Sequence, residues 1–451
     1  MAAVAVRDVR HSATGWRRVA FAMFAVAWGA NQFSPLLIVY RHDLRLNAGV
    51  LAGLFGVYAA PLIPGLLIGG PVSDRIGRRR VVIPFVALSP VATLLFMTGP
   101  RSLAVIAAGR ALAGLCSGVV FGSATAWIQE LSDDPAVSAR RSAVALSAGF
   151  GLGPAVASVI AQLGADPLVL PYLPHLIIGA AAVAIVWRAP ETCGGSARGA
   201  AGVPRAVGVA GLAGAAGAAR EWLPRAVRSP RFWLAVAPAA PWVFGSATLA
   251  FVVLPQEVTS AGRLSVGFAG LATTVTVAGA LAVQSLARRL EARRRLAGNV
   301  AGLACAVAAS ALAIVAVTTS SRAIALACAA LFGCAYGLCL VSGLRESERL
   351  AGPREHAAVV ACYYVLTYVG FGAAYLADGL NAVIGRTGTF VALAVAAALT
   401  AIWTAGYAAA SGPAGGEDGP ASRAAPVSRG GPVSRGGPAP GPPALNQPPP
   451  P

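Results

Sequence analysis

The chain has 451 residues, of which 57% are hydrophobic and only 12% are charged, and its formal net charge is +18. A soluble domain carries about 25% charged residues, so this composition excludes an ordinary soluble domain and indicates an integral membrane protein. The basic residues are scattered between apolar runs and share no single soluble face, which argues against nucleic acid as a partner.

Twelve apolar runs follow one another along the chain, each near the length of about 20 residues that crosses a bilayer as a helix. The first half contains the runs 17–40, 48–70, 80–98, 102–129, 138–162 and 169–188. The second half contains the runs 232–256, 264–286, 297–318, 322–344, 357–379 and 384–409. We therefore expect an all-α integral membrane fold of twelve transmembrane helices in two pseudo-symmetric six-helix bundles.

The same pattern predicts five regions. They are a cytoplasmic N-terminus (1–16), an N-terminal bundle (17–188), a central cytoplasmic loop (189–231), a C-terminal bundle (232–410) and a cytoplasmic tail (411–451). The tail is rich in proline and glycine and has too few apolar side chains to fold, so we expect it to be disordered.

The distribution of arginine predicts the orientation. With the N-terminus in the cytoplasm, the arginines outside are limited to Arg41, Arg45, Arg101, Arg263, Arg322 and Arg386. Arg110 lies within a run, and all the other arginines fall inside, as the positive-inside tendency requires. We therefore expect a multi-pass protein of the inner (plasma) membrane with both termini in the cytoplasm.

A short basic loop joins the second and third runs and reads GPVSDRIGRRR from Gly70 to Arg80. Its glycines permit a sharp turn or a close backbone approach. Its acid, Asp74, needs a positive partner, either Arg75 or the N-terminal end of another helix. The residues of interest in this loop are Gly70, Asp74, Arg75, Gly77, Arg78, Arg79 and Arg80.

Arg110 lies inside the fourth run, about 12 Å from its outer end at 1.5 Å per residue. An arginine at such depth costs about 2.5 to 3.5 kcal/mol unless it faces a wet cavity or a partner. We expect it to face the transport pathway; the alternative is a side chain that extends to the outer membrane surface. Gly114 follows one helical turn later.

The fifth run contains Gly149, Gly151, Gly153 and Pro154. Small side chains at this spacing allow close helix packing, and the proline frees a backbone carbonyl and permits a bend.

These motifs resemble those of the major facilitator superfamily. The basic loop matches the pattern G-x-x-x-D-[R/K]-x-G-[R/K]-[R/K]-[R/K] between helices 2 and 3 of that family. Arg110 to Gly114 is similar to its helix 4 pattern R-x-x-x-G, with Ala113 in place of the usual glutamine. The fifth run resembles the motif G-x-x-x-G-P-x-x-G-G of the drug:proton antiporter branch, with Ala157 and Ser158 replacing the last two glycines.

The resemblance implies a secondary active transporter that exports small molecules in exchange for protons by alternating access. In the mechanism that we expect, the basic loop acts as a conformational latch, in which Asp74 meets the start of the eleventh helix near His356 in the outward-open state. Arg110 then lies at the site of coupling. His175, in the sixth run, is a second candidate because an imidazole ordinarily titrates near neutrality, although a packing role is the alternative. The sequence leaves the proton acceptor unidentified.

Polar and aromatic residues near the middle of the helices are candidates for a substrate cavity: Asn31, Gln32, Trp242, Tyr363, Tyr364, Thr367 and Tyr368. Such a cavity suits flat, amphipathic or cationic compounds through stacking and cation–π contacts. Ordinary helix packing is the alternative for each residue.

A trace of internal repetition pairs the sequence ARRR at Ala292–Arg295 with GRRR at Gly77–Arg80. In this register Arg289 corresponds to Asp74, so we expect the second copy to keep the basic charge and lose the acid.

Two alternatives to export remain. One is an uptake carrier or uniporter for a nutrient with the same fold. The other is an integral membrane transferase, which needs paired acids or a His/Asp cluster that these loops do not offer. We therefore expect no enzyme, no cofactor and no metal, a small-molecule substrate with protons, the lipid bilayer as surroundings and a functional monomer.

Overall fold

The computed structural model describes residues 15–98, 102–192, 225–258, 263–351 and 356–411. All but a few of the residues in the predicted central loop and tail lie outside these ranges. The described residues belong to one compact unit, Met1–Gly412. Within these five ranges the regular elements are helices and no strand occurs.

The first six apolar runs form the helices of the first half. Run 17–40 is divided between α1 (Gly15–Asn31) and α2 (Leu37–Asp43), and run 48–70 between α3 (Ala48–Gly56) and α4 (Ala59–Ile76). The next three runs form α5 (Arg78–Thr98), α6 (Leu103–Glu130) and α7 (Pro135–Leu163). The sixth run forms the 3₁₀ turn η2 (Leu170–Tyr172) and α8 (Leu173–Val186).

The second half begins with the short helices α10 (Arg225–Arg228), α11 (Pro230–Ala235) and α12 (Pro241–Thr248). The π-helical turn η4 (Leu249–Val253) and α13 (Leu254–Val258) complete the seventh run. Then come α14 (Arg263–Ala282), α15 (Gln284–Arg293), α16 (Ala297–Thr319), α17 (Arg322–Leu350), α18 (His356–Val369), η5 (Gly370–Gly372) and α19 (Ala373–Ala410).

Eight helices in the described ranges are long and apolar enough to cross a membrane. The runs 17–40, 169–188 and 232–256 are divided among shorter helices, since prolines such as Pro35 and Pro238 interrupt them and cannot donate a backbone hydrogen bond. The last two runs share α19, whose backbone leaves helical geometry at Gly385, with φ 70° and ψ 171°. The predicted all-α membrane fold is confirmed.

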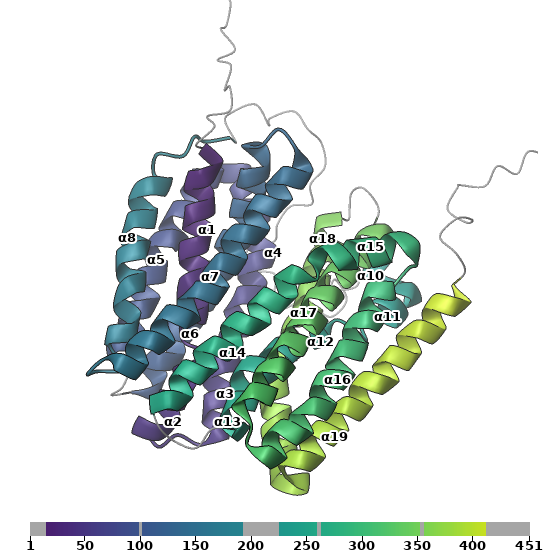
Figure 1. Cartoon of the computed structure of the whole chain (residues 1–451). Helices are drawn as coiled ribbons and strands as arrows, with labels where there is room; N and C mark the ends of the chain where they lie inside the picture. The colour runs from purple at the N-terminus through teal and green to yellow at the C-terminus, as the bar shows by residue number, and fades with distance from the viewer. Residues whose placement is uncertain (1–14, 99–101, 193–224, 259–262, 352–355, 412–451) are drawn as a thin grey trace, which may run out of the picture. The chain divides into compact units, whose positions relative to one another are not determined.

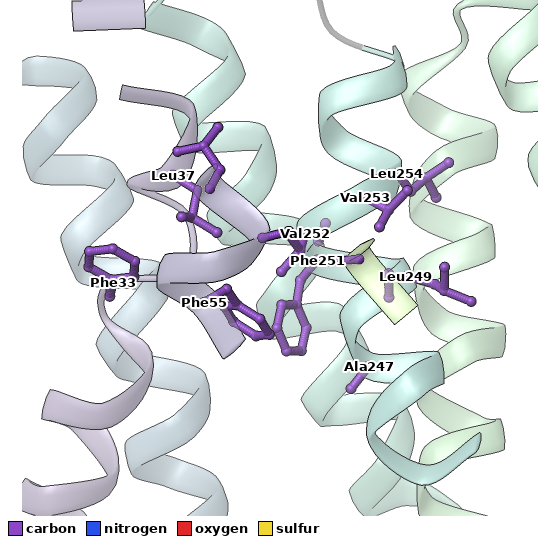
Figure 2. Close-up of a cluster of buried hydrophobic side chains, with 14 of the residues drawn as sticks. Phe33, Leu37, Phe55, Ala247, Leu249, Phe251, Val252, Val253 and Leu254 are labelled. Carbon is purple, nitrogen blue, oxygen red and sulfur yellow. The ribbon is translucent and has the colours of Figure 1, made fainter. Parts of the chain in front are cut away.

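Helices α1 to α8 gather in one group and α10 to α19 in another (Figure 1). The groups contact each other where α7 packs on α14, α4 on α18 and α3 on α19. Thr274 of α14 donates a hydrogen bond to the carbonyl oxygen of Gly151 in α7 over 3.4 Å. Phe55 of α3 and Phe251 of η4 also lie side by side in a buried cluster shared by both groups (Figure 2).

Candidate functional site

Arg78 is the centre of the basic loop in the first half. Its side chain is only 6% exposed and forms ion pairs with Glu130 at 2.6 Å and Asp74 at 2.5 Å. It also donates to the hydroxyl of Ser73. The carboxylate of Glu191 accepts the backbone N–H groups of Arg78 and Arg79 at 2.9 and 3.0 Å, and so caps the N-terminus of α5.

The other residues of this loop surround that cluster. Gly77 has φ 108°, a conformation that glycine adopts without strain, and it lies against the carboxylate of Glu191. Arg79 donates to the carbonyl of Trp187, while Arg75 and Arg80 are exposed and Gly70 faces open space.

Asp74 has the ion-pair partner Arg78 from its own half, and its side chain is 59% exposed. The partner predicted for Asp74 in the latch, His356, has a side chain that lies outside the described part of the chain. Contact between Asp74 and the start of α18 therefore stays a prediction.

A matching cluster in the second half corrects the predicted repeat register. Arg295 pairs with Glu346, a residue 51 positions later, as Arg78 pairs with Glu130, 52 positions later. Glu291 stands four residues before Arg295, as Asp74 stands four before Arg78. Glu291 rather than Arg289 is thus the counterpart of Asp74, and the expectation that the second copy lacks the acid is wrong.

Glu291 is fully buried and bonded on several sides. It accepts the backbone N–H groups of Leu296 and Gly298 at 3.2 and 3.0 Å at the start of α16, and the hydroxyl of Ser342. Arg349 lies 3.5 Å from Glu291 and 3.6 Å from Glu346. The run of arginines hid this register because it can be aligned in more than one way.

Arg110 is 1% exposed and is held by backbone carbonyls. Its guanidinium donates to the oxygens of Ala30, Leu54 and Phe55, each over 3.1 Å. These carbonyls lie at the breaks in the first two runs: the N–H of Ser34 bonds to Asn31, and α3 ends at Gly56. Arg110 thus satisfies acceptors that the interrupted helices leave free.

Aromatic rings complete the surroundings of Arg110, whose guanidinium carbon lies 4.8 Å from the ring centre of Phe33 and 4.7 Å from that of Tyr58. That Arg110 faces the transport pathway stays a prediction; its partners in this structure are the backbone and these rings. The alternative, extension to the outer surface, is wrong because the head group is buried. Gly114 packs directly against the backbone of Tyr58, so α6 and α4 approach closely.

The helix 5 motif packs against α1. Gly149 and Gly153 lie on the backbone near Phe24 and Trp28, where a larger side chain would collide with it. Pro154 has no N–H for the carbonyl of Phe150, and the side-chain amide of Asn31 donates to that oxygen over 2.8 Å. Two residues singled out separately in the sequence, Asn31 and Pro154, therefore belong to one interaction.

Gln32 and His175 belong to a buried polar chain between α1, α5 and α8. The amide of Gln32 donates to the hydroxyl of Thr93 over 3.0 Å, and that hydroxyl lies 2.7 Å from Nδ1 of His175. Ser89 lies 3.4 Å from the other ring nitrogen. These contacts hold His175 within the packing of the first half.

The residues predicted to line one aromatic cavity lie in separate places. Tyr363 donates to the carbonyl of Cys339 over 3.0 Å and Thr367 to that of Tyr364 over 2.7 Å, while Trp242 turns toward Thr400 of α19. Tyr364 contacts Tyr363 and is partly exposed. Tyr368 alone of this set joins the rings between the halves.

Tyr368 stacks on Phe244 with ring centres 4.7 Å apart and 9° between the planes. Phe371 lies 5.0 Å from Phe244 and 5.2 Å from Phe55 of the first half. Phe55 in turn lies 6.2 Å from Phe251 (Figure 2). Phe55, Phe251 and Phe371 were not predicted as site residues, because isolated phenylalanines in apolar runs carry no spacing signal.

Glu257 is the titratable group at the predicted outer end of α13, just beyond the run 232–256. Burial raises the pKa of its carboxyl group above the ordinary value, while Arg386, Arg41 and Asn381 act in the opposite direction.

Residues 19–375 match the family model described as Major Facilitator Superfamily. Over 136 residues the chain is 34% identical to the multidrug resistance protein MdtL of Escherichia coli O45:K1 (strain S88), an alignment covering 30% of this chain and 31% of MdtL. Over 145 residues it is 25% identical to the quinolone resistance protein NorA of Staphylococcus aureus (strain Mu50), covering 32% of this chain and 37% of NorA. The chain thus aligns with about a third of the length of these curated relatives.

Solved structures share the fold at low identity. A POT family transporter in complex with 5-aminolevulinic acid has a TM-score of 0.70 at 12% identity, covering 88% of this chain and 96% of that one. A bacterial homologue of the human lysosomal transporter Spinster has a TM-score of 0.58 at 14% identity, covering 89% and 96%. Because the family model covers most of the chain, the protein belongs to the Major Facilitator Superfamily of membrane transporters.

Proposed function

We propose that this transporter exports small aromatic or amphipathic molecules in exchange for protons, by alternating access. The observation that carries this proposal is the ring cluster between the two halves. Phe55 comes from the first half, whereas Phe244, Tyr368 and Phe371 come from the second. A flat, apolar molecule stacks favourably on such rings, and a cationic one gains cation–π contacts as well.

The position of the cluster suits alternating access. Two bundles that rock against each other around a shared site must separate the groups that line it. Phe55 would part from Phe371 in that motion, while the stacked pair Phe244 and Tyr368 stays together within the second half. Substrate stacked between them replaces the contact that is lost.

The curated relatives support the direction and the class of substrate. Their names refer to quinolone resistance and multidrug resistance, and drug export is the activity that we propose on that basis for this chain. Proton coupling rests on the resemblance to the antiporter branch. In this proposal the exposed Asp74 exchanges Arg78 for a partner at the start of α18 when the cytoplasmic ends close. The protein works as a monomer in the plasma membrane, with both termini in the cytoplasm.

The test uses the full chain in proteoliposomes that contain a pH-sensitive dye under an imposed proton gradient. A fluoroquinolone, a sugar and an amino acid are added in turn. We expect the fluoroquinolone to discharge the gradient. Phe244→Leu should weaken its apparent affinity about tenfold, since an aromatic pair contributes about 0.5 to 1.5 kcal/mol beyond its buried area.

Phe85→Leu is the matched control. Phe85 is a half-buried ring in α5 that packs against a separate cluster of buried residues within the first half, away from the ring cluster. Equal effects of the two substitutions would contradict a role for the ring cluster. Uptake of a labelled sugar or amino acid without proton movement would instead identify a nutrient uniporter.

A further inference from the structure

A polar cavity of about 770 Å³ opens at the predicted outer end of the molecule. The first half contributes Arg41 and Ala52, and the second half contributes residues of η4, α13 and α19. The volume is within the range of about 300 to 1,000 Å³ that is usual for small-molecule sites. The ring cluster lies elsewhere, since none of its residues Phe244, Tyr368 and Phe371 lines this cavity.

One pair of charges in the cavity is internally matched. Glu257 accepts a hydrogen bond from the side-chain amide of Asn381 over 2.9 Å and lies 3.5 Å from the guanidinium of Arg386. Arg386 also donates to the backbone carbonyl of Glu257 over 3.4 Å. These contacts neutralise Glu257 and fix it on the second half.

A second pair of charges is not matched. Arg41 donates to the neutral amide of Gln256 over 3.2 Å. It forms no ion pair within 4 Å in the described ranges, and Glu257, on which it acts from farther away, is already paired with Arg386. Asp378 lines the same cavity and has neither a hydrogen bond nor an ion pair with any described residue. The carbonyl oxygen of the Asn381 side chain is also buried there with no described donor.

We propose that this cavity binds a small zwitterion from the outer side, with the carboxylate of the ligand on Arg41 and its ammonium group on Asp378. An arginine and an aspartate that lack ion-pair partners attract a ligand that carries both a negative and a positive charge. Hydrogen bonds in which one group is charged are stronger than those between neutral groups. A net cation or a net anion satisfies only one of the two residues.

Such a ligand connects the two halves, since Arg41 belongs to α2 and Asp378 to α19. The bound ligand therefore favours the conformation in which the outer ends of the two halves are together. The size of the effect equals the difference between its affinities for that conformation and for the one with the outer ends apart. This site is independent of the proposed export of aromatic molecules, so it is tested by binding alone.

The experiment is a calorimetric titration of the purified full-length protein in detergent at pH 7.5. The probes are alanylalanine, its C-terminal amide and its N-acetyl derivative, which carry both charges, only the positive charge and only the negative charge. We expect alanylalanine to bind about tenfold more tightly than either derivative, a difference of about 1.4 kcal/mol.

Two substitutions assign the charges. Arg41→Gln should remove the preference for alanylalanine over its amide, whereas Asp378→Asn should remove the preference over the N-acetyl derivative. Arg45→Gln and Asp43→Asn are matched controls at exposed positions of the same end and should change neither ratio. Ala382→Leu narrows the cavity at an exposed lining residue without changing its charge, and should weaken all three probes.

No heat of binding from alanylalanine, or equal affinity for all three probes, would overturn the proposal. A charge preference that survives both Arg41→Gln and Asp378→Asn would also overturn it. If either variant does not fold, the Ala382→Leu titration decides between this cavity and another site.

Discussion

The two halves of the molecule hold the same arginine–carboxylate arrangement in opposite ways. In the first half the cation is buried and the acids are accessible: Arg78 is 6% exposed, whereas Asp74 is 59% and Glu130 is 33% exposed. In the second half the acids are buried and the cation is more accessible: Glu346 is 0% and Arg295 is 25% exposed. One sequence pattern therefore produces one cluster with accessible acids and one cluster with buried acids.

Burial explains why the clusters differ in their freedom to rearrange. An exposed carboxylate exchanges its partner for water at little cost, because surface ion pairs contribute only about 0 to 1 kcal/mol. A buried carboxylate that loses its partner stays uncompensated in a medium of low dielectric constant. Asp74 is therefore suited to change partners during transport, whereas Glu291 and Glu346 are suited to hold α15, α16 and α17 together.

The largest effect is expected at Glu346. Glu346→Gln removes the buried carboxylate that pairs with Arg295 and Arg349, and we expect it to lower the free energy of unfolding by about 3 kcal/mol or more. The measurement is unfolding of the purified protein in detergent. Glu130→Gln is the control from the first half and should cost less, since Asp74 still pairs with Arg78. Equal losses would remove the distinction between the clusters.

Arg110 extends the comparison to a buried cation whose polar partners are all backbone carbonyls. Arg110→Lys cannot reach the three oxygens at once, because an ammonium group lacks the planar fork of a guanidinium. We expect a loss of about 2 kcal/mol in the free energy of unfolding. Arg322→Lys, at an exposed arginine, should be close to neutral. If Arg110→Lys unfolds with the same free energy as the wild-type protein, these hydrogen bonds do not stabilise the fold.

Asp74 should show the smallest effect on stability and a large effect on transport. Asp74→Asn removes an exposed carboxylate charge while Arg78 keeps Glu130, and we expect a loss of less than about 1 kcal/mol in the free energy of unfolding. We nevertheless expect it to abolish substrate-driven discharge of the proton gradient in proteoliposomes, because the proposed latch needs the charge. Asp43→Asn, at the opposite end, should transport normally. Normal transport by Asp74→Asn would exclude the latch.

The length of apolar runs predicted the uninterrupted helices closely. The run 80–98 became Arg78–Thr98, and the run 102–129 became Leu103–Glu130. The breaks were harder to predict, since a turn at Val57 and Tyr58 or a π turn at Leu249 leaves hydropathy unchanged. Glu130 and Glu346, which pair with Arg78 and Arg295, come from distant helices, so their roles depend on tertiary packing that no local motif contains.

The hydrogen bond from Asn31 to the carbonyl of Phe150 has a mechanical consequence. A proline in a helix ordinarily creates a hinge, because the opposite carbonyl loses its donor and the two segments can flex. Here a side chain of α1 occupies that carbonyl at the point where α1 itself ends. Bending of α7 at Pro154 must therefore displace the end of α1. The two helices are expected to move together at this point rather than independently.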